Sequence, residues 1–90
     1  MKTIFITGAS SGLGKATAKL FASKGWKVIA TMRNPQNEKE LNSLNNVILL
    51  PLDVTNPAQI NETVQKAIAL GDIDVVFNNA GKMRYFSDNN

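Results

Sequence analysis

Three glycines stand at positions 8, 12 and 14, directly after a short apolar run near the start of the chain. The run covers residues 2–7 and is rich in β-branched side chains, which predicts a strand. Glycine adopts backbone conformations that other residues avoid, and it brings no Cβ into a crowded turn. The stretch therefore predicts a strand, a tight glycine-rich turn and then a helix.

The remaining chain alternates between apolar runs and amphipathic segments. The helix start before residue 57 is the clearest, because Asn56 can cap it, Pro57 suits the first turn and Gln59 stands three residues after the cap. Gly25 and Gly71 are placed to end the first and last predicted helices. The predicted strands are 2–7, 26–32, 47–50 and 73–77, and the predicted helices are 13–24, 36–46 and 57–70.

Strands that alternate with helices indicate an α/β fold, in which helices cover both faces of a parallel sheet. Because crossover connections are right-handed, we expect a Rossmann-like doubly wound parallel sheet with strand order 3-2-1-4. On the first helix we expect a buried face made of Leu13, Ala16, Leu20 and Phe21. We predict a partial nucleotide-binding domain over residues 1–81 and a frayed tail over residues 82–90.

The composition narrows the classes of function. The 90 residues carry a net charge of +3, and the basic residues are spread along the chain, unlike the dense stripe of a nucleic-acid binder. Cysteine and histidine are absent, which excludes disulfides, thiolate metal sites and the commonest neutral-pH base. The first apolar run is too short for a signal peptide or a membrane span. We expect a cytoplasmic protein with no metal, nucleic-acid or membrane partner.

The glycine-rich turn is a candidate phosphate site. A helix start leaves unpaired N–H groups and a partial positive charge, and an anion placed there satisfies both. Ser10 and Ser11 add hydroxyl groups at the same rim. The alternative is a plain strand-to-helix turn with a serine cap, which three glycines in seven residues disfavour.

The spacing of the glycines separates this turn from two common phosphate motifs. G-x-G-x-x-G requires a glycine where this chain has Thr17, and a Walker loop requires other residues at Ala9 and Ala16. The pattern that remains, Thr7-Gly8-x-x-x-Gly12-x-Gly14, resembles the cofactor turn of the classical short-chain dehydrogenases/reductases. Later motifs follow the order of that family: Arg33, then Asp53-Val54, then Asn78-Asn79-Ala80-Gly81.

This resemblance covers residues 2–81 and implies a dinucleotide cofactor. In the family, the Asp of the second motif lies against the adenine, and the Asn-Asn-Ala-Gly motif steadies the sheet and lines the cofactor cleft. The resemblance therefore assigns cofactor contacts to Thr7, Gly8, Ser10, Ser11, Gly12, Leu13, Gly14, Arg33, Asp53, Val54, Asn79, Ala80 and Gly81.

The end of the second strand predicts which dinucleotide is preferred. In dinucleotide-binding folds an acid about 20 residues past the glycines holds the ribose 2′-hydroxyl of NAD, whereas an Arg accommodates the 2′-phosphate of NADP. NAD-preferring relatives carry their acid at about Met32, and no carboxylate lies between Thr3 and Asn37. Arg33 follows instead, and Ser11 or Lys15 could reach the same phosphate. We therefore predict NADP in preference to NAD.

The resemblance also implies residues that this sequence lacks. The family transfers a hydride between the nicotinamide and a carbonyl or alcohol, using a Ser, a Tyr and a Lys four residues after the Tyr. The single tyrosine here is Tyr85, and Asn89 stands four residues on. We expect no catalytic residue in the chain, which then resembles the truncated, cofactor-binding N-terminal part of an oxidoreductase.

Two alternatives stay open at this stage. The chain could be a non-catalytic NADP-binding module or a subunit completed by a partner chain, or it could be a non-functional gene remnant. In a sheet that stops at the fourth strand, Val75, Val76 and Phe77 would form an open edge. We therefore expect low stability, and self-association or a partner chain at that edge.

Overall fold

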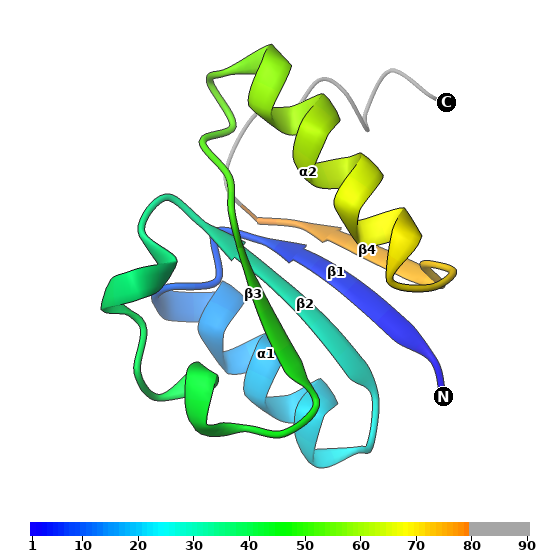
Figure 1. Cartoon of the computed structure of the whole chain (residues 1–90). Coiled ribbons are helices and arrows are strands. Elements are labelled where there is room, and N and C mark those ends of the chain that lie inside the picture. Colours follow the sequence, from blue (N-terminus) through cyan, green and yellow to red (C-terminus); the bar gives the residue numbers. More distant parts are fainter. Residues whose placement is uncertain (80–90) are drawn as a thin grey trace.

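The structure, a computed structural model, describes residues 1–79. The predictions for Ala80, Gly81, Tyr85 and the tail at 82–90 therefore lie outside the described residues. The elements run β1 (Thr3–Thr7), α1 (Gly12–Ser23), β2 (Lys27–Met32), η1 (Pro35–Asn37), η2 (Leu41–Ser43), β3 (Val47–Pro51), α2 (Pro57–Ala69) and β4 (Val75–Asn78). The four strands form one parallel sheet in the order β3-β2-β1-β4, which confirms the predicted fold and strand order (Figure 1).

The sheet lies between two helical layers, with α1 on one face and α2 on the other (Figure 1). Successive side chains of a strand point to opposite faces, so neighbouring residues serve different layers. Ile4 and Ile6 belong to the apolar cluster that includes Ala18 of α1. Phe5, between them, belongs to the cluster that includes Ile60 of α2. β1 is buried along its whole length because both of its faces are covered.

The buried face of α1 differs from the prediction. Leu13 and Leu20 are 65% and 52% exposed, and Ala16 is also exposed. The buried residues of the helix are Gly14 and Ala18. Small residues at these positions let the helix axis lie close to the sheet, and this close contact turns the leucines toward solvent. Phe21 is the one member of the predicted face that packs against the core.

The segment between β2 and β3 also differs from the prediction. It contains two short 3-10 turns, η1 and η2, rather than one helix over 36–46. Between them the backbone of Glu38 is extended, and its side chain accepts a hydrogen bond from the backbone N–H of Leu41 at 2.9 Å. This bond starts the second turn separately from the first. The buried side chain of Leu41 then anchors the segment to the α1 side of the sheet.

Several element ends follow the sequence closely. The side chain of Asn56 accepts a hydrogen bond from the backbone N–H of Gln59 at 3.1 Å, so it caps α2 as predicted. Gly25 and Gly71 follow α1 and α2 with φ angles of 83° and 145°, which favour glycine.

β4 begins at Val75, two residues later than predicted. The preceding Asp74 is held by Thr3: its side chain accepts a hydrogen bond from the backbone N–H of Thr3, and its own N–H donates to the carbonyl oxygen of Thr3.

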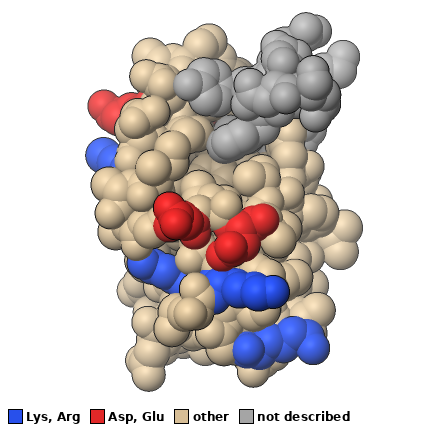
Figure 2. Space-filling model, turned by 90° about the vertical axis from the view of Figure 1, so that its right-hand side faces the viewer, with Lys and Arg blue, Asp and Glu red and all other residues tan. Residues whose placement is uncertain are grey.

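Figure 2 shows the side of the molecule that lies at the right of Figure 1. On this side, basic and acidic side chains stand next to one another and do not form a continuous basic stripe. Over residues 1–79, neither helix has the length and apolar character needed to cross a lipid bilayer.

Candidate functional site

The turn between β1 and α1 has the backbone that its glycines predict. Gly8 and Gly12 have φ angles of 65° and 57°. This left-handed region is costly for residues with a Cβ, so the path of the turn depends on glycine at both positions. The turn lies at the carboxyl end of β1, between β2 and β4, which is the switch point of the sheet.

Gly14 is required for a different reason, which is the closeness of α1 to the turn. A Cβ built on Gly14 would lie 2.2 Å from the carbonyl oxygen of Gly8 and 2.7 Å from Nδ2 of Asn79. The first contact is with backbone, which cannot move aside like the end of a flexible side chain. Glycine at this position therefore sets the distance between the first turn of α1 and the strand ends.

Within residues 1–79, the first turn of α1 has no side-chain cap. Ser11 is the capping residue and has extended backbone, but its side chain makes no cap hydrogen bond, and the first turn contains no acidic residue. The serine cap that the plain-turn alternative requires is therefore not formed. The first N–H groups of the helix and its dipole are left for an anion. Ser10, Ser11, Gly12 and Leu13 are all exposed around this point.

Hydrogen bonds tie the end of β4 to the same turn. The hydroxyl of Thr7 donates to Oδ1 of Asn78 at 3.0 Å and accepts from the backbone N–H of Asn79 at 2.9 Å. The side-chain amide of Asn79 donates to the carbonyl oxygen of Gly8 at 3.2 Å. Residues more than 70 positions apart in the sequence therefore fix the shape of the turn. Asn78 belongs to the motif that the resemblance predicts to steady the sheet, although it is not among the predicted cofactor contacts.

The end of β2 is tied to the turn in a similar way. The hydroxyl of Thr31 donates to the carbonyl oxygen of Ile6 at 2.8 Å, and the backbone N–H of Ala9 donates to the carbonyl oxygen of Thr31 at 3.0 Å. All three residues are buried. The turn is thus held by the strands on both sides of β1.

A cleft of about 490 Å³ opens beside the turn, at the carboxyl ends of β1, β2 and β3. It brings together four of the residues assigned from the sequence, namely Gly8, Ser10, Arg33 and Val54. Thr7, Gly14 and Asn79 lie behind the turn, where they support it. The cleft is lined by Gly8, Ser10, Met32, Arg33, Asn34, Asn37, Glu38, Leu52 and Val54.

Arg33 lines the cleft, and Asp53 lies beside Arg33. Nε of Arg33 lies 3.9 Å from Oδ1 of Asp53, and the two side chains are 70% and 41% exposed. The same carboxylate oxygen accepts hydrogen bonds from the hydroxyl and the backbone N–H of Thr55, at 2.6 Å and 3.0 Å. These bonds, and then the charge of Arg33, lower the pKa of Asp53 below its ordinary value of 3.8. An exposed ion pair of this length is weak, so the guanidinium can turn toward a ligand.

Glu38 is a residue of the cleft that the sequence reasoning missed. The stretch without a carboxylate ends at Asn37, and the next residue, Glu38, is buried and lines the cleft together with Arg33. Nζ of Lys15 lies 3.3 Å from Oε2 of Glu38 and 2.9 Å from Oε1 of Glu40, and these acids raise the pKa of Lys15 above 10.5. No sequence pattern marks Glu38 for this place, because its burial follows from contacts with Lys15 and Leu41 that only the fold brings together.

A parallel sheet wound in this order, with a glycine turn and a cleft at its switch point, defines the dinucleotide-binding class of α/β proteins. The family model described as short chain dehydrogenase matches residues 2–90 of the chain. The chain therefore belongs to the short-chain dehydrogenase family.

Individual relatives agree with this assignment. The chain is 42% identical over 84 residues to the short-chain dehydrogenase PC-15 of Penicillium crustosum, which covers 89% of this chain and 31% of that protein. Among solved structures, ElxO with NADP bound matches with a TM-score of 0.80 and 36% identity, over 90% of this chain and 35% of that one. A 3-ketoacyl-(acyl-carrier-protein) reductase from Brucella melitensis complexed with NADH matches with a TM-score of 0.76 and 29% identity, over 83% and 32% of the two chains.

The chain therefore spans about a third of the length of the relatives that it matches. Relatives with either NADP or NADH share its fold. A nucleotide cofactor is thus common to these relatives, and they include both the phosphorylated and the unphosphorylated form.

Proposed function

We propose that this chain is the NADP-binding N-terminal part of an oxidoreductase that transfers a hydride between NADP(H) and a carbonyl or alcohol. In this proposal the catalytic Ser, Tyr and Lys lie outside these 90 residues. The observation that carries the proposal is the cleft at the switch point, which Arg33 lines together with Gly8 and Ser10 of the turn that leads into the uncapped start of α1. This combination suits a ligand with two separate phosphate groups.

The geometry of the site supports a division of roles. The exposed start of α1 suits a diphosphate, because within residues 1–79 the Ser11 side chain does not cap it and glycines at 12 and 14 bring no Cβ to it. The cleft suits the adenosine, with Asp53 and Val54 on the side of the adenine. The remaining assignments are for Ala80 and Gly81, which lie outside the described residues, and they stay predictions from the resemblance.

Arg33 favours NADP over NAD in this proposal. Its guanidinium is exposed at the cleft and has several donors for a dianionic phosphate. Met32, at the position where NAD-preferring relatives carry an acid, is buried and apolar. We therefore expect the 2′-phosphate to add affinity.

Thermal melting of the 90-residue chain with each cofactor tests the proposal. Trp26 is the single tryptophan and packs edge-to-face on Phe21, with ring centroids 4.9 Å apart, so its fluorescence reports folding. It precedes β2, whereas the cleft lies at the far end of that strand. Saturable stabilisation by NADP, larger than by NAD at equal concentration, is the expected result. Equal stabilisation by the two would contradict the preference, and none by either would contradict the site.

An Arg33→Met variant tests which residue provides the preference. We expect the affinity for NADP to fall by about tenfold or more, because a charge-assisted phosphate contact contributes about 1.5–3 kcal/mol. The affinity for NAD should change little. Lys24→Met, which removes a charge at the opposite end of α1, is the matched control and should leave both affinities as in the wild type.

A second candidate function is a non-catalytic NADP-binding module or a subunit completed by a partner chain. The observation that favours it is the exposure of Val75 and Val76, at 39% and 40%, on β4, which pairs only with β1 within residues 1–79. A strand of this kind can accept another strand from a second chain. A partner that co-purifies with the chain and restores catalysis in trans would support a completed subunit, and one that gives no catalysis would support a binding module. We propose the cytoplasm as the compartment in either case, which cell fractionation tests.

A further inference from the structure

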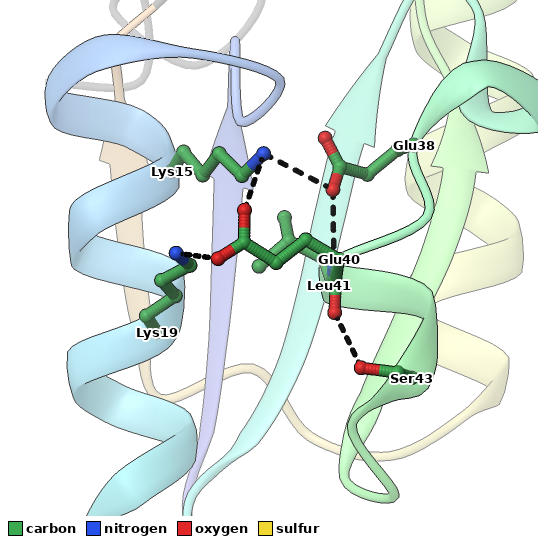
Figure 3. Close-up of polar contacts among 6 residues, drawn as sticks. All are labelled: Lys15, Lys19, Glu38, Glu40, Leu41 and Ser43. Carbon is green, nitrogen blue, oxygen red and sulfur yellow. Dashed lines mark hydrogen bonds and ion pairs between the residues drawn. The ribbon is translucent and has the colours of Figure 1, made fainter.

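A cluster of four charged residues joins α1 to the segment between β2 and β3. It consists of Lys15 and Lys19 on the helix and Glu38 and Glu40 on the facing segment (Figure 3). Lys19 pairs with Glu40, and Lys15 lies between Glu40 and Glu38. None of the four is among the cofactor residues that the resemblance assigns, yet one member of the cluster reaches the cleft.

That member is Glu38. Its side chain is only 6% exposed, and a single carboxylate oxygen, Oε2, takes both the ion pair with Lys15 and the hydrogen bond from Leu41 (Figure 3). Removing a carboxylate from water is costly unless charge and hydrogen bonds compensate it. Lys15 provides that charge, and the side chain of Glu38 is thereby held as part of the cleft wall.

The charges at the wall matter for the proposed ligand. Arg33 and Glu38 line the same cleft, so a phosphate held by Arg33 also lies near a carboxylate. A dianion is repelled by that carboxylate and attracted by the ammonium behind it, whereas a hydroxyl carries no net charge and is affected much less. The pair as a whole is neutral. Removing either member would change the net charge beside the cleft by one unit.

We propose that the Lys15–Glu38 pair determines how strongly the cleft discriminates between a ribose 2′-phosphate and a ribose 2′-hydroxyl. This inference rests on the proposed NADP site and adds two residues to its specificity. Glu38 acts as the negative element that limits the affinity for the phosphate, and Lys15 offsets it. Glu40 pairs with both Lys19 and Lys15, but it does not line the cleft, so we assign the discrimination to Glu38 and Lys15.

The test uses two probes that differ by one phosphate, adenosine 2′,5′-bisphosphate and adenosine 5′-monophosphate, titrated calorimetrically into the 90-residue chain. Glu38→Gln removes the charge but keeps an oxygen that can accept from Leu41, so it should bind the bisphosphate about tenfold more tightly. Lys15→Met should bind it about tenfold more weakly. The double variant should return close to the wild type, and all three should bind the monophosphate within about twofold of the wild type.

Lys19→Met is the matched control, because it removes a lysine from the same helix and the same cluster but has no contact with Glu38. It should bind both probes as the wild type does. Lys15→Met leaves a buried carboxylate without its cation and can lose stability for that reason alone. The Glu38→Gln variant then decides the question by itself, because its expected change is a gain of affinity, which a damaged fold does not produce.

The outcomes separate the two proposals. If the wild type binds the bisphosphate and Glu38→Gln leaves or lowers its affinity, the charge role of the pair is wrong while the NADP site stands. Equal losses for both probes would make the pair a support of the cleft rather than a determinant of specificity. If the wild type binds neither probe, the proposed site itself is wrong, and the inference is overturned together with it.

Discussion

Gly14 lies where α1 approaches the turn after β1, and its missing side chain allows that approach. In a Gly14→Ala variant the new Cβ would overlap the carbonyl oxygen of Gly8, at 2.2 Å. Relief requires α1 to move away from the sheet, so we expect a loss of about 1–3 kcal/mol in the free energy of unfolding. The displaced helix start should also respond less to NADP. Urea denaturation with and without the cofactor measures both effects.

Gly12→Ala is the matched comparison at the scale of one residue. A Cβ there meets nothing within 4 Å, so the cost comes only from the φ of 57°. That cost is about 1–2 kcal/mol. Stabilisation by NADP should be retained better than in Gly14→Ala. If Gly14→Ala were as stable as the wild type, the close contact of α1 with the turn would be wrong.

For single residues, the sequence predicted those that need an unusual φ angle. It did not predict those whose burial depends on residues distant in the sequence. The glycine turn was predictable because φ angles such as that of Gly8 leave few other choices of residue. Glu38 was not predictable as part of the cleft. Its burial depends on Lys15, which is distant in sequence and is brought close only by the packing of α1.

Among the elements, α2 depends most clearly on one local signal. Asn56 caps it, and α2 packs on the face of the sheet that holds Phe5 and Ile29. We expect Asn56→Ala to lower the free energy of unfolding by about 1 kcal/mol, because the N–H of Gln59 loses its acceptor. Gln65→Ala, at an exposed position within the same helix, should have an effect close to zero. Equal effects of the two substitutions in urea denaturation would contradict a capping role.

Helix α1 shows why the face of an element is harder to predict than its existence. Leu13, Ala16 and Leu20 have helical spacing, and that spacing predicted a buried face. The helix instead meets the sheet through Gly14 and Ala18. The spacing of apolar residues does not show how close two elements lie, and close packing requires small residues at the contact.

The helix predicted over 36–46 was wrong because of a side-chain contact that the spacing does not show. The side chain of Glu38 accepts a hydrogen bond from the N–H of Leu41 and starts a second turn within the segment.

For the whole molecule, the charged groups predict how stability depends on pH. Hydrogen bonds from Lys19 and then Lys15 lower the pKa of Glu40 below 4.5, and those from Thr55 lower that of Asp53 below 3.8. A carboxyl group with a lowered pKa binds fewer protons in the folded state. Its contribution is therefore complete above the unfolded-state pKa and is lost as the pH falls through the folded-state pKa.

We therefore expect the free energy of unfolding to decrease below about pH 5. Urea denaturation at a series of pH values measures the decrease. In a Glu40→Gln variant the decrease should be smaller, because one of the two groups no longer titrates. Glu62→Gln, an exposed substitution on α2, should follow the wild type. A Glu40→Gln curve parallel to the wild type would show that its ion pairs do not contribute to folding.

The exposed side of β4 predicts association between copies of the chain. Among residues 1–79 β4 pairs only with β1, and the exposed Val75 and Val76 leave apolar surface beside that edge, which favours pairing with another chain. We expect the weight-average mass in sedimentation equilibrium to rise with concentration, and Val76→Lys to reduce that rise. Leu20→Lys replaces an exposed apolar side chain on α1 and should leave the rise in mass with concentration unchanged. A mass independent of concentration for the wild type would contradict the prediction.

The central position of β1 has a consequence for the order in which the chain becomes ordered during synthesis. β1 is synthesised before the strands that flank it, and one of them, β4, follows it by 71 residues, as the paired residues Ile4 and Val75 show. The pairing of β1 with β2 closes a far shorter loop and can form while the rest is still being translated. The edge of β1 that pairs with β4 therefore stays without its partner strand until residues 75–78 have been synthesised. Arrested nascent chains that end before β4 should therefore bind chaperones through the segment Ile4-Phe5-Ile6.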